Sequence, residues 1–363
     1  MIIITSVLKK YAPVFTVFFI GIVFFTNVKN TNLAVKSALI FCFESLVPSI
    51  FIYMVFFSFL LYLCDLSGIL SKCNNSLFKL LGICRKYFFE VLLCSVCGFV
   101  SGAKIISEKF KKIGGSEVEF SNAVILSSNA GVGFLVGCVG VKIWDSAIFG
   151  VYLFFSQILI SILLGRLILK HPKFNDTSLI LPRHNSSFSS AFCRAVSTSS
   201  LTIISMCAFV VVFSCFSENL FSLFRIKKNS PLYLTVSIIL EFSQGIFLCA
   251  SYGDLVACAF MTGFCVGFGG LCVHFQIFST CEGLPLDKMR FIIFKLFHGV
   301  LCGFSSLIYV LASGIEPSRL AINILDTGKI CIGFGDLIFI FATIFTLFLI
   351  LRSIFLKILL ILR

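Results

Sequence analysis

Polar and charged side chains stand beside glycine breaks in two stretches of otherwise apolar sequence. The first stretch reads Gly98-Phe-Val-Ser-Gly-Ala-Lys104, and Asn129 and Gly131 follow it. The second reads Glu241-Phe-Ser-Gln-Gly245, and it precedes Gly269, Gly270, His274 and Gln276. A bilayer tolerates broken helices and polar groups only where protein or a water-filled cavity satisfies them. Because paired breaks in two halves of a chain are typical of transporter binding sites, we expect a carrier.

Lys104 is the first candidate for chemistry, because it follows the glycine break closely. We expect it near the first turn of a helix that runs through Lys112. The free N–H groups and positive dipole of such a helix start would form an anion site together with the ammonium. Two alternatives stay open: Lys104 extends to the membrane edge, or it pairs with Glu108 four residues on.

Asn129, Gly131 and Gly133 form the second candidate group. The amide offers donors and acceptors to a ligand, and the glycines allow close backbone approach. The alternative is a helix-packing face of the Gly-xxx-Gly type, which Gly133 and Gly137 also fit. Packing explains the glycines but leaves the asparagine unexplained.

Glu241 lies inside an apolar run, with Gln244 one turn later on the same face. A buried carboxylate must be protonated, paired or solvated, so Glu241 could couple proton movement to transport or pair with Lys104. A structural ion pair is the alternative. His274 can donate a hydrogen bond or change its charge near neutral pH, and it can equally be a hydrogen-bonded structural residue.

The predicted site therefore combines residues from both glycine-broken stretches. We predict that the substrate contacts Ser101, Gly102, Lys104, Asn129, Gly131, Glu241, Gln244, Gly269, Gly270, His274 and Gln276. The sequence contains no Gly-x-Ser-x-Gly, Gly-Lys-Ser/Thr or His-Glu-x-x-His motif and no carboxylate cluster. We therefore expect no catalytic residues, no metal site, no cofactor and no enzymatic activity.

Composition places the chain in the bilayer. The 363 residues are 59% hydrophobic and only 12% charged, about half the charged fraction of soluble domains. The net charge of +13 comes from basic residues that flank apolar runs, so we expect contact with anionic lipid and not with nucleic acid. Cys94 and Cys97 have a redox or metal spacing, but their apolar helix favours packing.

Apolar runs predict an all-α polytopic membrane protein with about 8–10 membrane-embedded segments, some broken or re-entrant. The clearest runs cover residues 12–28, 47–64, 146–169, 201–224, 292–312 and 335–356. We expect an N-terminal transmembrane helix in 1–34, a first repeat in 35–170, a polar connector in 171–186, a second repeat in 187–312 and a C-terminal transmembrane helix in 313–363. Three basic clusters, near residues 104–112, 166–183 and 225–228, would all be cytoplasmic by the positive-inside rule.

At these residues the chain resembles the sporulation integral membrane proteins of endospore-forming bacteria, which carry paired nucleoside-recognition (Gate) domains. The strings that carry the resemblance are Gly98-Phe-Val-Ser-Gly-Ala-Lys104, Ser128-Asn-Ala-Gly131, Leu240-Glu-Phe-Ser-Gln-Gly245, Phe268-Gly-Gly-Leu-Cys-Val-His-Phe-Gln276 and Glu44-Ser-Leu-Val-Pro-Ser49. They span roughly residues 35–312. The chain departs from the family pattern at Val100 and Val132, where the family has proline.

The resemblance implies two inverted Gate-like repeats and export of dipicolinate, the pyridine dicarboxylate of spores. The carrier would move it from the mother cell into the forespore, across the outer forespore membrane. The residues alone predict only a transporter, with an anion as one substrate class. A nucleoside or cation carrier, or a non-transporting membrane protein that assembles a larger complex in sporulation, remain alternatives. The oligomeric state is not predicted.

Overall fold

The computed structural model describes residues 20–63, 84–169, 187–228, 230–251 and 254–318, and five positions between 11 and 18. The predicted polar connector at 171–186 and the apolar run at 335–356 lie outside these residues. Within the described part the chain forms twelve α-helices, two π-helical pieces and one 3₁₀ turn, with no strand. The predicted all-α class is therefore confirmed.

The first half begins with a long helix that is interrupted by a π-helical piece. It comprises α2 (Val28–Phe41), η1 (Cys42–Leu46) and α3 (Val47–Leu63). After the short turn η2 (Arg85–Tyr87) come α6 (Phe88–Cys97), α7 (Phe99–Ile113), α8 (Glu117–Ser127), the π-helical η3 (Phe134–Ile143) and α9 (Ala147–Ile168).

The second half has the same order of elements. It begins with α10 (Phe188–Leu223) and continues through α11 (Pro231–Leu240), α12 (Phe242–Ser251), α13 (Leu255–Phe268), α14 (Gly270–Thr280) and α15 (Lys288–Ser313). Each half therefore has a 36-residue helical stretch, two pairs of short helices and one long closing helix.

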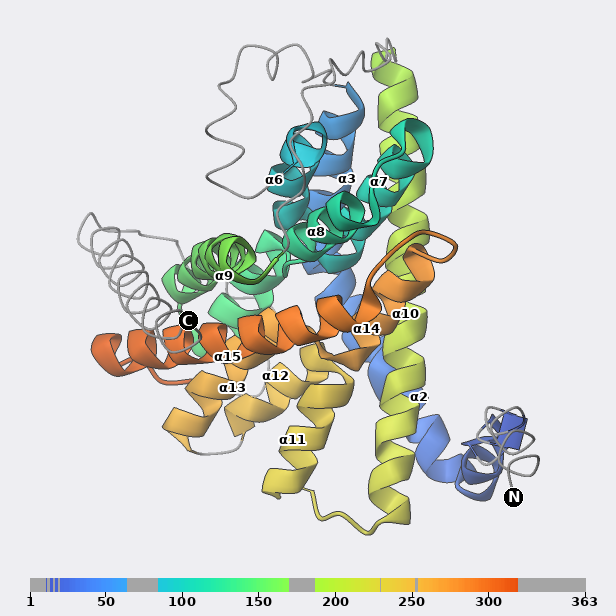
Figure 1. Ribbon diagram of the computed structural model, residues 1–363. Coiled ribbons are helices and arrows are strands. Elements are labelled where there is room, and N and C mark those ends of the chain that lie inside the picture. Colours follow the sequence, from blue (N-terminus) through green and yellow to red (C-terminus); the bar gives the residue numbers. More distant parts are fainter. Residues whose placement is uncertain are drawn as a thin grey trace, which may run out of the picture.

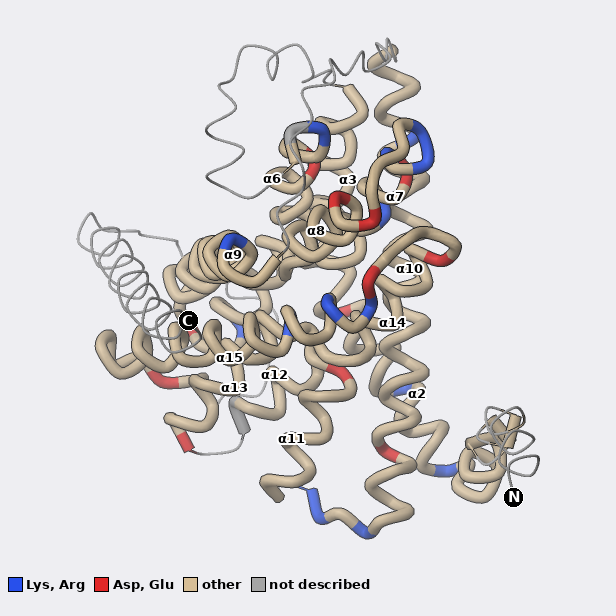
Figure 2. Tube along the Cα trace, viewed as in Figure 1, with Lys and Arg blue, Asp and Glu red and all other residues tan. Residues whose placement is uncertain are grey.

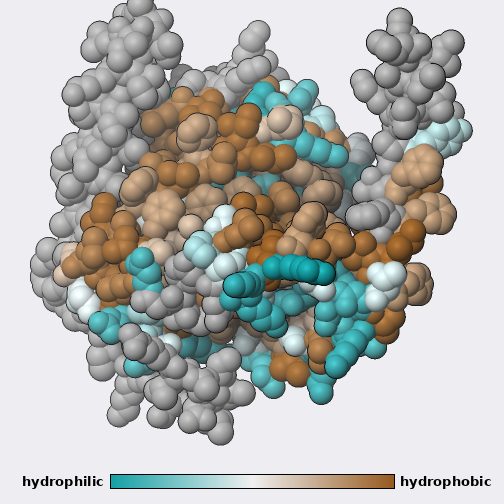
Figure 3. All heavy atoms as spheres, turned by 90° about the horizontal axis from the view of Figure 1, so that it is seen from below, coloured by the Kyte–Doolittle hydropathy of each residue, from teal (hydrophilic) through white to brown (hydrophobic). Residues whose placement is uncertain are grey.

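Five stretches in the described part are long and apolar enough to cross a membrane, namely Val28–Leu63, Ala147–Ile168, Phe188–Leu223, Leu255–Thr280 and Lys288–Ser313. Three shorter apolar helices are α6, α11 and the piece η3. Large apolar side chains such as Phe25 and Leu201 are exposed, and apolar side chains cover wide areas of the face in Figure 3. The chain is a multi-pass integral membrane protein.

The long helices do not share one direction. Figure 1 shows α10 running vertically beside α2 and α3, while α15 runs horizontally and packs on α13 and α9. The short helix pairs fill the angle between these two groups, with α7 contacting α14 and η3 contacting α12. In each of these two contacts, the second helix of the first pair in one half meets the second helix of the second pair in the other half. The halves therefore meet through their short helices.

Glycines permit the close packing of α13 on α15. A Cβ atom at Gly267 would lie 2.7 Å from both the Cα atom of Gly299 and the carbonyl oxygen of His298. Gly263, one turn before Gly267 on α13, and Gly303, one turn after Gly299 on α15, are similarly crowded. Small residues at such spacing let two membrane helices approach closely.

Basic residues collect at opposite ends of α10. Near its N-terminus, Arg194 forms an ion pair with Glu108 in α7, whose last turn carries Lys111 and Lys112. Beyond its C-terminus lie Lys227 and Lys228, at the lower end in Figure 2. The expectation that these clusters share one membrane face is incompatible with an α10 that crosses the bilayer.

Candidate functional site

Four helix breaks meet at one place in the interior. They lie at Gly98 between α6 and α7, at residues 128–131 before η3, at Glu241 between α11 and α12, and at Gly269 between α13 and α14. The rings of Phe99 and Phe242, the first residues of α7 and α12, are 5.4 Å apart in an edge-to-face arrangement. Phe134, the first residue of η3, lies at the same distance from Phe242.

The breaks approach so closely because glycines stand at the contacts. A Cβ atom at Gly131 would lie 3.2 Å from the carbonyl oxygen of Cys97, and one at Gly269 would lie 3.2 Å from the ring of Phe99. Gly98 and Gly269 also have φ angles of 110° and 81°, which side chains with a Cβ atom rarely adopt. The sequence prediction of broken helices at these glycines is confirmed.

A small cavity lies at this meeting point. It has a volume of about 20 Å³, enough for roughly one water molecule. Its walls come from α3, α6, α7, α10 and α12 and from residues 130–134, and most of them are apolar. Of the predicted site residues, Ser101 and Gly131 line it.

The start of α7 offers backbone donors to this cavity. Gly98 precedes the helix and has no side chain to cap it, and residues 98–101 all line the cavity. The first N–H groups of a helix have no partner within the helix. These N–H groups and the hydroxyl of the buried Ser101 are therefore hydrogen-bond donors in residues of an otherwise mostly apolar cavity wall.

Lys104 lies one turn beyond Ser101 and reaches toward α10. Its ammonium donates to the carbonyl oxygen of Thr198 and to Oγ1 of Thr202, both at 3.3 Å. Thr202 is in turn one turn before Met206, which lines the cavity. Lys104 is therefore half-buried and packs against α10, one turn from a residue of the cavity wall.

The two ion pairs considered for Lys104 are not formed. Glu108 accepts a hydrogen bond of 2.7 Å from Arg194 instead. Glu241 caps its own helix, since its carboxylate accepts from the backbone N–H groups of Ser243 and Gln244 and from the Ser243 hydroxyl. Gln244 thus contributes its backbone to the Glu241 cap.

Asn129 and Gly102 both contact the last turn of α8. The Asn129 amide nitrogen donates to the carbonyl oxygen of Leu126 at 2.8 Å and to Ser95 at 3.4 Å. Its Oδ1 atom is buried without a partner among the described residues. Gly102 is a packing position, because a Cβ atom there would lie 2.8 Å from the carbonyl oxygen of Ser127.

His274 and Gln276 are buried on α14 behind the Gly269–Gly270 break. His274 Nδ1 lies 2.5 Å from the carbonyl oxygen of Gly270, and Gln276 donates to the thiol of Cys272 at 3.2 Å. Nε2 of His274 and Oε1 of Gln276 have no partner within the described part of the chain. These two residues do not line the cavity, and neither do Gly269 and Gly270.

Three polar residues at the breaks were not predicted. Gln157 of α9 receives a hydrogen bond of 3.1 Å from the N–H group of Ala130 and donates to its carbonyl oxygen at 2.7 Å. His298 of α15 lies within 3.0 Å of carbonyl oxygens of both Gly267 and Gln157. Lys295, one turn earlier, donates to the carbonyl oxygen of Ser128. Lys295 and His298 could have been identified from the sequence, because ionisable residues inside an apolar run such as 292–312 are rare and usually functional.

Comparisons with known proteins give this chain no relative: no protein-family model, no curated protein and no solved structure matches it. The resemblance to the Gate-domain proteins therefore remains a prediction from its sequence strings. Among the described residues, no group of three or more His, Cys, Asp and Glu side chains could hold a metal ion.

Proposed function

We propose that the protein is a secondary carrier of a small organic anion, which it binds where the four helix breaks meet. The observation that carries this proposal is the uncapped start of α7, which lines an interior cavity beside Ser101. Broken helices that direct their N-termini at an anionic group are a known means of substrate binding near the middle of a bilayer. Lys104, one turn away, adds a positive charge.

Dipicolinate is the anion that we propose, on the strength of the sequence resemblance. It is small and planar, and its two carboxylates would match the N–H groups of α7 and an ammonium group. The protein would then export it from the mother cell into the forespore, across the outer forespore membrane. The two halves would be inverted Gate-like repeats, which supports a carrier with a site at their interface.

The size of the cavity bears on the transport cycle. A volume of about 20 Å³ is too small for a pyridine dicarboxylate, so the helices around it must separate before the substrate enters. Met54 of α3, Met206 of α10 and Phe242 of α12 form much of the wall. Movement of these three elements relative to α7 would provide alternating access.

Replacement of Lys104 tests the anion site. We expect the Lys104→Ala variant to lose uptake of labelled dipicolinate into proteoliposomes by roughly 30-fold or more, because removing a partly buried charge contact costs several kcal/mol. Lys36→Ala is the matched control, since Lys36 is exposed on α2 and should leave uptake unchanged. Normal uptake by well-folded Lys104→Ala would exclude the predicted role of Lys104.

A nucleoside carrier is the second candidate, and a separate observation favours it. Buried acceptor atoms of Asn129, His274 and Gln276 have no partner within the described residues. These atoms would accept hydrogen bonds from a base or a ribose, whereas they would repel a carboxylate. Inhibition of uptake by nucleosides and not by dicarboxylates would favour this candidate over the anion carrier.

A further inference from the structure

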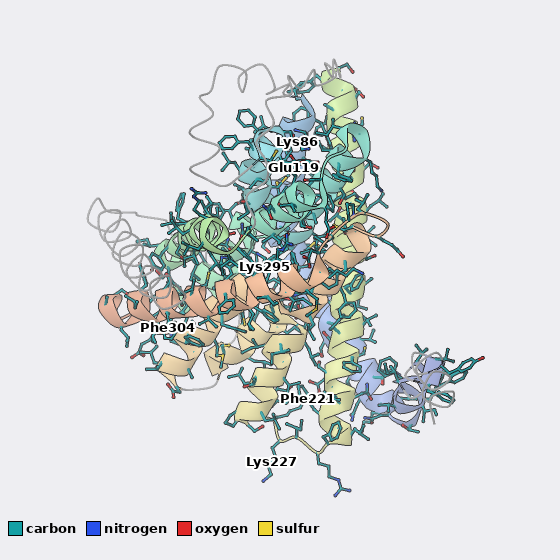
Figure 4. All side chains as sticks on the ribbon, viewed as in Figure 1. Lys86, Glu119, Phe221, Lys227, Lys295 and Phe304 are labelled. Carbon is teal, nitrogen blue, oxygen red and sulfur yellow. The ribbon has the colours of Figure 1, made fainter. Side chains whose placement is uncertain are left out.

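Lys295 is a buried lysine at the centre of the molecule, on α15. Its side chain is 1% exposed, and Figure 4 shows it where α15 passes the lower end of the first half. The ammonium donates to the carbonyl oxygen of Ser128, which stands at the break after α8. It also lies 5.6 Å from the centre of the Phe99 ring, at the start of α7.

No carboxylate balances this lysine within the described part of the chain. The four ion pairs found there join Lys86 to Glu119, Lys109 to Glu90, Arg194 to Glu108 and Arg290 to Asp287. The ammonium contacts one carbonyl oxygen and lies within 6.0 Å of the ring centres of Phe99 and Phe294. Cys302, His298 and His274 are also close enough to interact with it electrostatically. An ammonium has three donors, and a buried charge without an opposite charge is costly. A bound anion would supply the missing opposite charge and acceptors for the remaining donors.

Phe99 links Lys295 to the cavity. The ring lines the cavity and is also the nearest aromatic group to the Lys295 ammonium. The cavity wall formed by residues 130 and 131 begins two residues after Ser128, the partner of Lys295. A displacement of the Phe99 side chain during opening would bring the ammonium into contact with a bound molecule.

We propose that Lys295 binds the second carboxylate of a small dicarboxylate, while the start of α7 and Lys104 bind the first. This inference rests on the proposed anion transport and adds the basis of selectivity, namely two positive groups on different helices. Lys104 approaches from α7 on the α10 side, and Lys295 approaches from α15. A dianion then neutralises both groups, whereas a monoanion leaves one of them unpaired.

The test compares two substrates that differ by one carboxylate. Uptake of labelled dipicolinate and of labelled picolinate, the monocarboxylate, is measured in proteoliposomes with wild-type protein and with Lys295→Gln. Glutamine keeps a donor for the Ser128 carbonyl and removes the charge. We expect dipicolinate uptake to fall roughly 30-fold, while picolinate uptake changes less than about 3-fold. Lys295→Arg should retain the preference for dipicolinate.

A matched control and the remaining outcomes separate this inference from the proposed function. Lys142→Gln removes another ammonium that donates to a helix carbonyl, that of Glu44, away from the cavity, and should change neither rate. If the ratio of dipicolinate uptake to picolinate uptake is the same in Lys295→Gln as in wild type, the inference is wrong. The proposed anion transport is not affected by that result. If the Gln variant does not fold, loss of the preference in Lys295→Arg would equally overturn the inference. No uptake of either substrate by wild type would refute the proposed function itself.

Discussion

At the residue scale, the buried carboxylate and the buried ammonium differ in how they are compensated. Glu241 accepts three hydrogen bonds from Ser243 and Gln244 at the start of its own helix. Such a cap stabilises a carboxylate locally and leaves little capacity for a ligand. Lys295 has one carbonyl oxygen and no acid partner among the described residues. Of these two buried groups, the ammonium and not the carboxylate therefore lacks compensation among the described residues.

The ion pair of Lys86 and Glu119 joins η2, the turn before α6, to the start of α8 (Figure 4). Burial acts to raise the pKa of Glu119, but the hydrogen bonds from Lys86 and from the backbone of Ser116 outweigh it and lower the pKa below its ordinary value of 4.5. A group with a lowered pKa stabilises the fold above its unfolded-state pKa, and this contribution is lost as the pH falls through the folded-state value.

We therefore predict that Glu119→Gln lowers the free energy of unfolding at neutral pH by about 1–3 kcal/mol. Thermal unfolding in detergent, followed by the fluorescence of the single tryptophan, Trp144, measures it. The difference from wild type should shrink as the pH is lowered below 4.5. Glu117→Gln is the control, because Glu117 is exposed in the same helical turn. If wild type and Glu119→Gln differ as much in their free energy of unfolding at acidic pH as at neutral pH, the ionised Glu119 carboxylate is not the source of the stabilisation.

At the element scale, broken helices were predictable and their partners were not. Gly98 and Gly269 interrupt apolar runs and adopt positive φ, so the sequence marks these breaks directly. Lys104 is different, since its partners Thr198 and Thr202 lie about one hundred residues away on α10. No local spacing indicates which helix will lie beside it. Lys295 is a charged residue inside the apolar run 292–312, but the sequence does not indicate that it lies beside Ser128.

The packing of α13 on α15 gives a prediction at this scale. Gly267→Ala should lower thermal stability by about 1–3 kcal/mol, because the added methyl group would meet Gly299 and the His298 carbonyl at 2.7 Å. Thermal unfolding in detergent, followed by the fluorescence of Trp144, also measures this change. Gly21→Ala is the comparison, since no atom lies within 4 Å of the added methyl group there. Equal effects of the two substitutions would show that close glycine packing does not hold α13 and α15 together.

At the scale of the whole molecule, α10 predicts which basic residues lie on opposite sides of the membrane. Lys112 at the end of α7 and Lys228 beyond α10 lie at opposite ends of this 36-residue helix, and Figure 4 shows Lys227 at its lower end. A helix of that length spans about 54 Å, more than the hydrocarbon core of a bilayer.

An epitope inserted after Lys112 and one inserted after Lys228 should accordingly be accessible from opposite sides of the membrane. Antibody binding to intact and to permeabilised cells distinguishes the two sides. Both residues are exposed, so the insertions should be tolerated. Access to both epitopes from one side would show that α10 does not cross the bilayer, in agreement with the positive-inside prediction.

Transport by the purified protein is the most direct test of the central claim. Uptake of labelled dipicolinate would be measured in proteoliposomes that contain the wild-type chain and in protein-free liposomes, with and without an imposed ion gradient. We predict saturable uptake that requires the protein and is inhibited by unlabelled dicarboxylates. Uptake no faster than in protein-free liposomes, by protein that is folded and monodisperse, would contradict the assignment of this chain as an anion carrier.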